Sequence, residues 1–416
     1  MAIENFEKKL KDYAELIVKV GLNVQAGQKV VIRAGLNTAP LVREIAAVAY
    51  QLGSPLVTIL WSDEKVSQVR HEFAPRDSFD QAPTWMYEGV AQEIKDGAAY
   101  LQVFGLDPEL LKGFDPKVVA TTRQTVAKNY RPIGELQGES VTQWTLVCPP
   151  TPDWAKRVFP ELDVDAALEK LWRNVFTLCR LDNDDPVAVW KQHMADLKKR
   201  REALTAKAYT AMHFRAPGTD LKVGLPQGHI WMGGGSDASN NTNYAPNIPT
   251  EEVFTLPHKD QTEGTVSSTK PLSYYGSMIE NFSLTFKNGK VVELSAEKGE
   301  DVLRDMVGTD DGAGFLGEVA IVPHKSPISQ SNIVFLNTLY DENASCHLAL
   351  GRAYKFNLDG GPEMSNDEFF AAGGNSSNIH VDFMFGSGEL DVDGVTADGR
   401  VEPVLRSRKW ALDAWT

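Results

Sequence analysis

The hydrophobic positions in the first half of the chain alternate between helical and strand-like spacing. An amphipathic helix is predicted at the start, because apolar residues recur there every three or four positions: Phe6, Leu10, Tyr13 and Ile17. Residues 29–32 then form a short, largely apolar run typical of a buried strand. A second helix is expected from an N-cap at Thr38 to Gly53, and another strand at residues 56–60. This order predicts a β-α-β unit.

Further strands and helices extend this pattern to about residue 200. Buried strands are expected at residues 100–104 and 145–148, the second of which ends before Pro149 and Pro150. Strands that alternate with helices are typical of a sheet whose strands run mostly parallel. The sequence therefore predicts an N-terminal α/β domain, residues 1–200, with a mostly parallel sheet.

Beyond residue 200 the pattern changes to short strands and turns. Asn288 and Gly289 lie between apolar runs at residues 282–286 and 291–294, which predicts a hairpin with an Asn-Gly turn. A short helix is expected around residues 301–307. We therefore expect a β-rich C-terminal domain, residues 201–416, so that the fold class is α/β plus α+β.

The net charge argues against several classes of partner. The chain has 56 acidic and 42 basic residues, a formal charge of −14, which disfavours nucleic acid and anionic lipid. The first residues alternate charged and apolar side chains and resemble neither a signal peptide nor a membrane helix. Three cysteines without a CxxC motif indicate neither a disulfide framework nor a zinc ribbon. We expect a soluble cytoplasmic protein that binds neither nucleic acid nor membranes.

Two familiar motifs occur in the wrong setting. Residues 312–317 match GxGxxG, but a helix-like segment precedes them and a strand-like segment follows, the reverse of a dinucleotide site. His71-Glu72 opens like HExxH, yet Pro75 occupies the position of the second histidine. Neither motif predicts a function here.

The first candidate site lies in the apolar segment at residues 379–385. In a strand, His380 and Asp382 share one face, while Val381, Phe383 and Phe385 share the other. Imidazole and carboxylate groups both bind cations such as Zn²⁺, Mn²⁺ or Co²⁺ directly. The alternative is a hydrogen-bonded His/Asp pair on a solvated face.

Four other polar residues lie in similarly apolar or tightly bounded segments: Glu251, Glu252, Glu318 and His347. Because adjacent side chains diverge in an extended segment, a metal site can readily recruit only one of the two neighbouring glutamates. Taken singly, Glu318 could be a solvated residue at a strand end and His347 a hydrogen-bonded core histidine. Tyr354 on its own suggests ordinary packing.

Four motifs together resemble those of the thermophilic-type aminopeptidases, the family that includes aminopeptidase T and aminopeptidase S. They are NIPTEEVFT from residue 247, GFLGEVA from 314, NASCHLALGRAY from 343 and IHVDFM from 379. The first half of the chain matches mainly in its α/β pattern. The resemblance implies that Tyr354 is an active-site residue and that five residues bind metal: Glu252, Glu318, His347, His380 and Asp382.

Five ligands, three of them carboxylates, are too many for one tetrahedral zinc and suit two cations about 3.5 to 4 Å apart. We therefore expect two divalent ions, drawn from Zn, Co, Mn or Mg, with Glu318 bridging them. Tyr354 would help to stabilise the oxyanion that forms when water attacks the first peptide carbonyl. Glu251 is the candidate for a general base or for an anchor of the substrate's free amine.

The resemblance implies a homodimeric aminopeptidase that acts on peptides with a free N-terminus. Two alternatives stay open at this stage. Another metal-dependent amidase or peptidase could use the same cations. A noncatalytic protein could bind a small ligand in its α/β domain and use the C-terminal residues as an ion-pair network.

Overall fold

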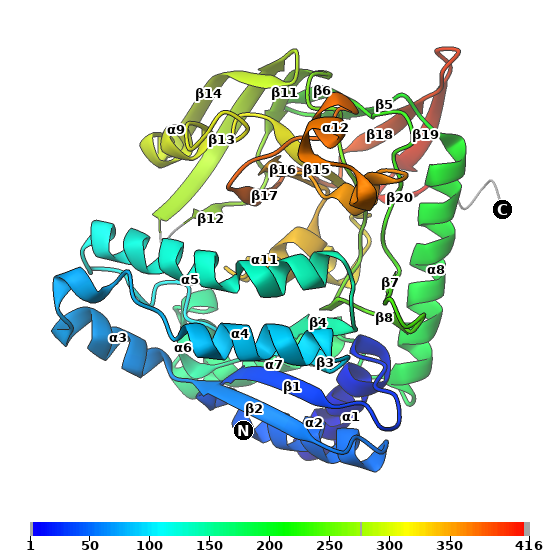
Figure 1. The fold of residues 1–416 in the computed structure, drawn as a ribbon. Coiled ribbons are helices and arrows are strands. Elements are labelled where there is room, and N and C mark those ends of the chain that lie inside the picture. Colours follow the sequence, from blue (N-terminus) through cyan, green and yellow to red (C-terminus); the bar gives the residue numbers. More distant parts are fainter. Residues whose placement is uncertain (1–2, 275–276, 412–416) are drawn as a thin grey trace. The chain divides into compact units, whose positions relative to one another are not determined.

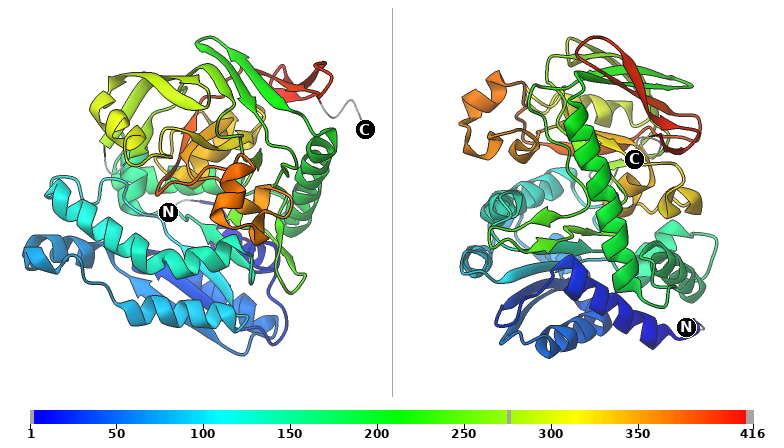
Figure 2. Two further views of the ribbon diagram at one scale, coloured as in Figure 1. Left: turned by 45° about the horizontal axis from the view of Figure 1, so that its top comes forward. Right: turned by 90° about the vertical axis from the view of Figure 1, so that its right-hand side faces the viewer.

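The computed structural model describes residues 3–274 and 277–411 (Figure 1). The chain divides into an N-terminal unit, Met1–Gln192 with Gly235–Pro249, and a C-terminal unit, His193–Gly234 with Thr250–Thr416. The division falls within helix α8 (Pro186–Lys207), which is continuous and drawn in green in Figure 2. The expected domain limits at residues 200 and 201 stay a prediction.

The N-terminal unit contains the expected parallel sheet. Its strand order is β2-β1-β3-β4-β9, and all four pairings are parallel. The fifth strand comes from late in the chain and was not anticipated. The strands are β1 (Val30–Gly35), β2 (Val57–Ser62), β3 (Ala99–Val103), β4 (Trp144–Val147) and β9 (Asn247–Ile248), and a separate pair is formed by β7 (Ser236–Asp237) and β8 (Asn243–Tyr244).

Helices pack against this sheet through apolar stripes. On α2 the buried positions, including Leu41, Ile45 and Val48, recur at helical spacing, and Gly53 ends the segment with φ +91°. Thr38 lies at the N-cap position of α2, as expected, but its side chain accepts no hydrogen bond from the helix, and its hydroxyl donates to the carbonyl of Gly35. The helices are α1 (Phe6–Leu16), α2 (Ala39–Gln51), α3 (Glu64–Phe73), α4 (Thr84–Lys95), α5 (Pro116–Gly138), α6 (Pro152–Val158) and α7 (Val164–Leu178).

The C-terminal unit is β-rich, as expected, and its larger sheet has nine strands. The predicted hairpin is present: Asn288 and Gly289 both have positive φ, at 49° and 78°, as a tight Asn-Gly turn requires. The strands of this sheet are β5 (Ala211–Ala216), β6 (Thr219–Gly224), β11 (Thr262–Ser267), β12 (Leu272–Tyr274), β13 (Ser277–Lys287), β14 (Lys290–Lys298), β18 (Asp391–Val395), β19 (Val401–Arg406) and β20 (Lys409–Trp410).

A four-stranded antiparallel sheet packs against the larger one and carries the candidate site. Its order is β10 (Val253–Thr255), β15 (Leu316–Ile321), β16 (His347–Gly351) and β17 (His380–Met384). The Phe383 ring on β17 lies 5.5 Å from the ring of Phe282 on β13. This apolar face belongs to the core of the unit, so the opposite face of β17 is left for polar residues.

The short α-helices in the described part of the C-terminal unit are α9 (Glu300–Val307), α10 (Pro327–Ser331), α11 (Thr338–Asp341) and α12 (Asn366–Ala371). In the part of the chain that the structure describes, no helix combines the length and the apolar character needed to span a bilayer.

Candidate metal centre

The candidate site is built on one face of the four-stranded sheet. Glu318 on β15 and Asp382 on β17 both pair with Ala349, which lies on the strand between them. Directly paired residues point to the same face, so both carboxylates project over a small methyl group. His347, two residues before Ala349, shares this face. The alternation predicted for residues 379–385 thus places His380 and Asp382 on the side facing away from Phe383.

Two groups of possible metal ligands form on this face, and they share Glu318. Glu252, Glu318 and His347 form one group, and Glu318, His380 and Asp382 form the other; within each, the ligand atoms lie within 4.8 Å of one another. The Nε2 atom of His347 lies 3.0 Å from Glu252 and 3.5 Å from Glu318. The Nε2 atom of His380 lies 3.7 Å from Glu318 and 3.6 Å from Asp382.

Backbone carbonyls orient both histidine rings. The Nδ1 atom of His347 lies 3.0 Å from the carbonyl oxygen of Ser345, and that of His380 lies 2.7 Å from the carbonyl oxygen of Arg352. A carbonyl accepts only from a protonated nitrogen, so Nδ1 carries the proton in each neutral ring and Nε2 presents its lone pair to the centre. Histidines that bind metals are usually held in this way.

Four carboxylates gather at this site. We call Glu252, Glu318, Glu342 and Asp382 the carboxylate cluster. Among residues 3–274 and 277–411, no lysine or arginine forms an ion pair with any of them. Buried atoms Oε2 of Glu252 and Oδ1 of Asp382 also have no hydrogen-bond partner among these residues. Such atoms are costly to bury unless a cation compensates for them.

The pKa directions reflect the same excess of negative charge. Burial, together with the neighbouring Glu252 and Asp382, raises the pKa of Glu342 well above its usual value. Burial alone would lower the pKa of His380, but Asp382 and Glu318 raise it to about 9. Burial likewise opposes the charged form of His347, and its contacts with Glu252 and Glu318 raise its pKa well above the usual value. The site therefore favours positive charge at its centre.

The donor set fits divalent cations. When all four carboxyls are ionised and both histidines are neutral, the carboxylate cluster carries a formal charge of −4, which divalent cations would offset. Carboxylate oxygens with two imidazole nitrogens suit Zn²⁺, Mn²⁺ or Co²⁺.

Comparison with known proteins identifies the family. A sequence model described as thermophilic metalloprotease (M29) matches residues 6–410. The chain belongs to this family. It is 46% identical to aminopeptidase AmpS of Bacillus subtilis (strain 168) over 410 residues, 99% of this chain and 100% of that protein. Aminopeptidase 2 of Geobacillus stearothermophilus is 45% identical over 414 residues, with 99% and 100% covered.

A solved structure supports the same assignment. Wild-type AmpT from Thermus thermophilus matches with a TM-score of 0.93 and 42% identity, and the match covers 98% of this chain and 100% of that one. The fold class and the family resemblance inferred from the sequence motifs are therefore confirmed, and the chain is a metalloprotease of the M29 family.

Glu251 and Tyr354, which were expected to act in catalysis without binding metal, lie outside the two ligand groups. The side chain of Glu251 lies 3.7 Å from Nε2 of His193, while Glu252 joins the ligands, so the adjacent glutamates diverge. The ring of Tyr354 lies 4.7 Å from that of His380 and stacks on Phe356. Burial, with Glu318 and Asp382, raises the pKa of Tyr354, so its hydroxyl keeps its proton and can donate.

Sequence reasoning missed three residues of this M29 site. Glu342 belongs to the carboxylate cluster, and its position directly before the NASCHL motif is the signal that could have identified it. Asn343 accepts a hydrogen bond of 2.7 Å from the backbone N–H of Glu251. His193 lies 2.8 Å from the carbonyl oxygen of Thr250, but its place within the long helix α8 gave no local signal.

Proposed function

We propose that this M29 metalloprotease removes N-terminal residues from peptides with two divalent cations, held by Glu252, Glu318, His347, His380 and Asp382. Its activity as a metal-dependent aminopeptidase follows from the family and from relatives that are named as aminopeptidases. These relatives match this chain over their whole length. The two-cation arrangement is our proposal. The observation that carries it is the pair of ligand groups that share Glu318.

Bound divalent cations would polarise the scissile carbonyl and supply a nucleophilic water near neutral pH. The chain's own residues would direct this chemistry. Glu318, which belongs to both ligand groups, would help to hold both cations. The protonated hydroxyl of Tyr354, whose ring lies against His380, would donate to the developing oxyanion.

Glu251 is proposed to bind the free amine of the substrate or to accept a proton. Its backbone N–H is fixed by Asn343 and its side chain lies near His193, so its position is set independently of the ligands. An ammonium group beside a buried carboxylate gains a charge-assisted hydrogen bond. An N-acetylated peptide has no such ammonium group.

The experiment that tests this function compares leucinamide with N-acetyl-leucinamide, before and after chelation. We expect cleavage of leucinamide alone, loss of cleavage with a chelator, and recovery on addition of Zn²⁺, Co²⁺, Mn²⁺ or Mg²⁺. Equal cleavage of both amides would favour a general amidase. Cleavage that is indifferent to chelation would contradict the metal mechanism.

We also propose, on the resemblance to the family, that the protein is a homodimer in the cytoplasm and takes its cations from Zn, Co, Mn or Mg. Light scattering tests the first point, because a particle of one chain's mass at all concentrations would contradict it. The metal bound depends on availability as well as on the ligands.

A further inference from the structure

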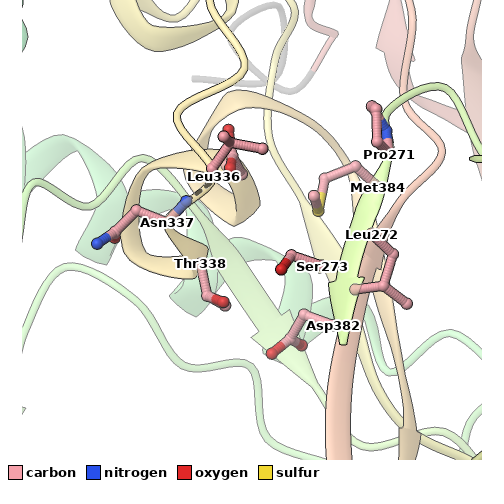
Figure 3. Close-up of a pocket in the computed structure, with 9 residues that line it drawn as sticks. Pro271, Leu272, Ser273, Leu336, Asn337, Thr338, Asp382 and Met384 are labelled. Carbon is pink, nitrogen blue, oxygen red and sulfur yellow. Dashed lines mark hydrogen bonds between the residues drawn. The ribbon is translucent and has the colours of Figure 1, made fainter. Parts of the chain in front are cut away.

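A cavity of about 100 Å³ lies beside the candidate metal centre, within the C-terminal unit (Figure 3). Its walls come from β12, from β17 and from the loop that leads into α11. The residues on which the argument depends are Leu272, Ser273, Leu336, Thr338, Asp382 and Met384. Asp382 belongs both to this wall and to the ligand groups, so the cavity adjoins the centre directly.

The geometry of β17 sets the distance between the centre and the cavity. His380, Asp382 and Met384 point to the same face because side chains alternate along a strand. At a rise of about 3.3 Å per residue, Met384 lies roughly 7 Å farther along the strand than Asp382. A side chain on either residue flanking the scissile bond begins only a few bonds from the reacting carbonyl. A substrate held at the centre can therefore place a side chain in this cavity.

The walls define the chemistry of that side chain. Leu272, Leu336 and Met384 supply apolar surface, while Ser273 and Thr338 supply hydroxyl groups. Asp341 and Asp382 also line the cavity, and no described residue of the wall is a lysine or an arginine, so an acidic side chain would find no cationic partner there. An apolar cavity of about 150 Å³ is known to hold benzene in an engineered lysozyme, so about 100 Å³ corresponds to roughly four carbon atoms. This is the size of a leucine side chain.

The loop that forms one wall holds an unusual backbone conformation. Leu336 has φ +54°, a region that bulky residues rarely adopt. The carboxylate of Asp341 accepts hydrogen bonds from the N–H groups on either side, those of Phe335 at 2.8 Å and Asn337 at 3.0 Å. Asp341 therefore fixes the segment that carries Leu336 against the cavity. Strained residues held in this way are concentrated at binding and catalytic sites.

We propose that this cavity receives the side chain of the peptide's N-terminal residue, that it selects side chains of about leucine size without negative charge, and that Leu336 and Met384 set its depth. The inference rests on the proposed aminopeptidase function. Asp341 acts as a positioning residue through Leu336.

The test uses the metal-loaded enzyme and aminoacyl amides that share one leaving group, with alanyl, leucyl and phenylalanyl side chains. In the natural protein we expect a higher kcat/KM for leucyl than for phenylalanyl amide. Met384→Ala and Leu336→Ala each enlarge the cavity, and should raise the phenylalanyl-to-leucyl ratio by about tenfold or more. Val292→Ala, which trims an exposed residue on β14, is the matched control and should leave the ratio unchanged.

A second series separates the two sides of the scissile bond, with alanyl dipeptides that vary only in their second residue. Changes confined to this series would overturn the proposal, because the cavity would then receive the second residue. Unchanged rankings in both series would overturn it as well. If the natural protein cleaves none of these substrates when loaded with metal, the proposed function fails instead.

Binding gives a readout that does not depend on turnover. Calorimetry should show that the natural protein binds leucine, a product of the reaction, more tightly than phenylalanine. Met384→Ala should reduce or reverse that preference, and Val292→Ala should not. Equal preferences in all three proteins would contradict the assignment.

Discussion

Two regions of the C-terminal unit bury carboxylates, and they balance the negative charge in different ways. On β18, Asp393 is only 1% exposed and forms ion pairs with Arg215 on β5 and Arg406 on β19. In the carboxylate cluster, Glu252 and Glu318 are buried and Glu342 and Asp382 are half-buried, but no described lysine or arginine pairs with them. The protein thus supplies arginines where a carboxylate is structural, and leaves the cluster dependent on positive charge from elsewhere.

This contrast separates a structural ion pair from a binding site. Burying a charge requires a partner, and an arginine on a neighbouring strand provides a permanent one. Among the described residues, those beside the cluster that can become positive are His347 and His380, and the neighbouring carboxylates raise the pKa of both. Divalent cations would therefore compensate the negative charge of such a site. Replacing its carboxylates should lower the activity far more than replacing Asp393.

The largest expected effect follows from substitution of the shared ligand. Glu318→Gln keeps the size of the side chain but removes the charge between the two ligand groups. We expect kcat to fall by at least about 10³-fold, because the cations lose their common carboxylate. Measurement of leucinamide cleavage with excess metal checks this. Full activity in the metal-replete variant would remove the two-cation scheme.

The same variant should behave differently once metal is removed. In the chelated protein, Glu318→Gln relieves repulsion among buried carboxylates and should leave the free energy of unfolding unchanged or raise it by about 1 kcal/mol. Asp393→Asn should instead lower it by about 2 to 3 kcal/mol, with or without metal, since two arginines lose their partner. Thermal unfolding of both variants, with and without a chelator, compares the two regions directly.

A smaller effect is expected when the charge balance is left intact. Tyr354→Phe removes only a hydroxyl group next to His380, so the cations should stay bound. We expect kcat to fall by about 10²-fold, the usual loss for one donor to an oxyanion. Elemental analysis of the variant provides the control. A loss of metal as large as the loss of activity would mean that Tyr354 supports the ligands instead.

The smallest expected effect concerns pH and Asp341. Burial, partly offset by the N–H groups of Phe335 and Asn337, raises the pKa of Asp341 to about 6 from a usual value of 3.8. Because the folded-state pKa is raised, the stability that this carboxyl contributes is fully present below about pH 4 and declines as the pH rises through 6. The Tm of the natural protein relative to Asp341→Asn should therefore fall by a few degrees between pH 4 and 6.5. A constant difference would contradict the shifted pKa.

Much of this arrangement could be predicted from local patterns. Alternation placed His380 and Asp382 opposite Phe383, and the Asn288-Gly289 turn set the hairpin, because both depend only on neighbouring residues. Strand β9 was missed, since it joins the parallel sheet by pairing with β4, about 100 residues earlier in the chain. Glu342 was missed because it begins a 3₁₀ helix of only three residues, Glu342–Ala344, which is too short for a periodic pattern to indicate which way a side chain points.

The most direct test of the central claim is a count of the cations bound to each chain. Elemental analysis of the natural protein, purified without chelators and desalted, should find two divalent ions per chain, and Glu318→Gln should retain fewer than one. A natural protein that is fully active without any bound divalent cation would show that the carboxylate cluster balances its charge in another way.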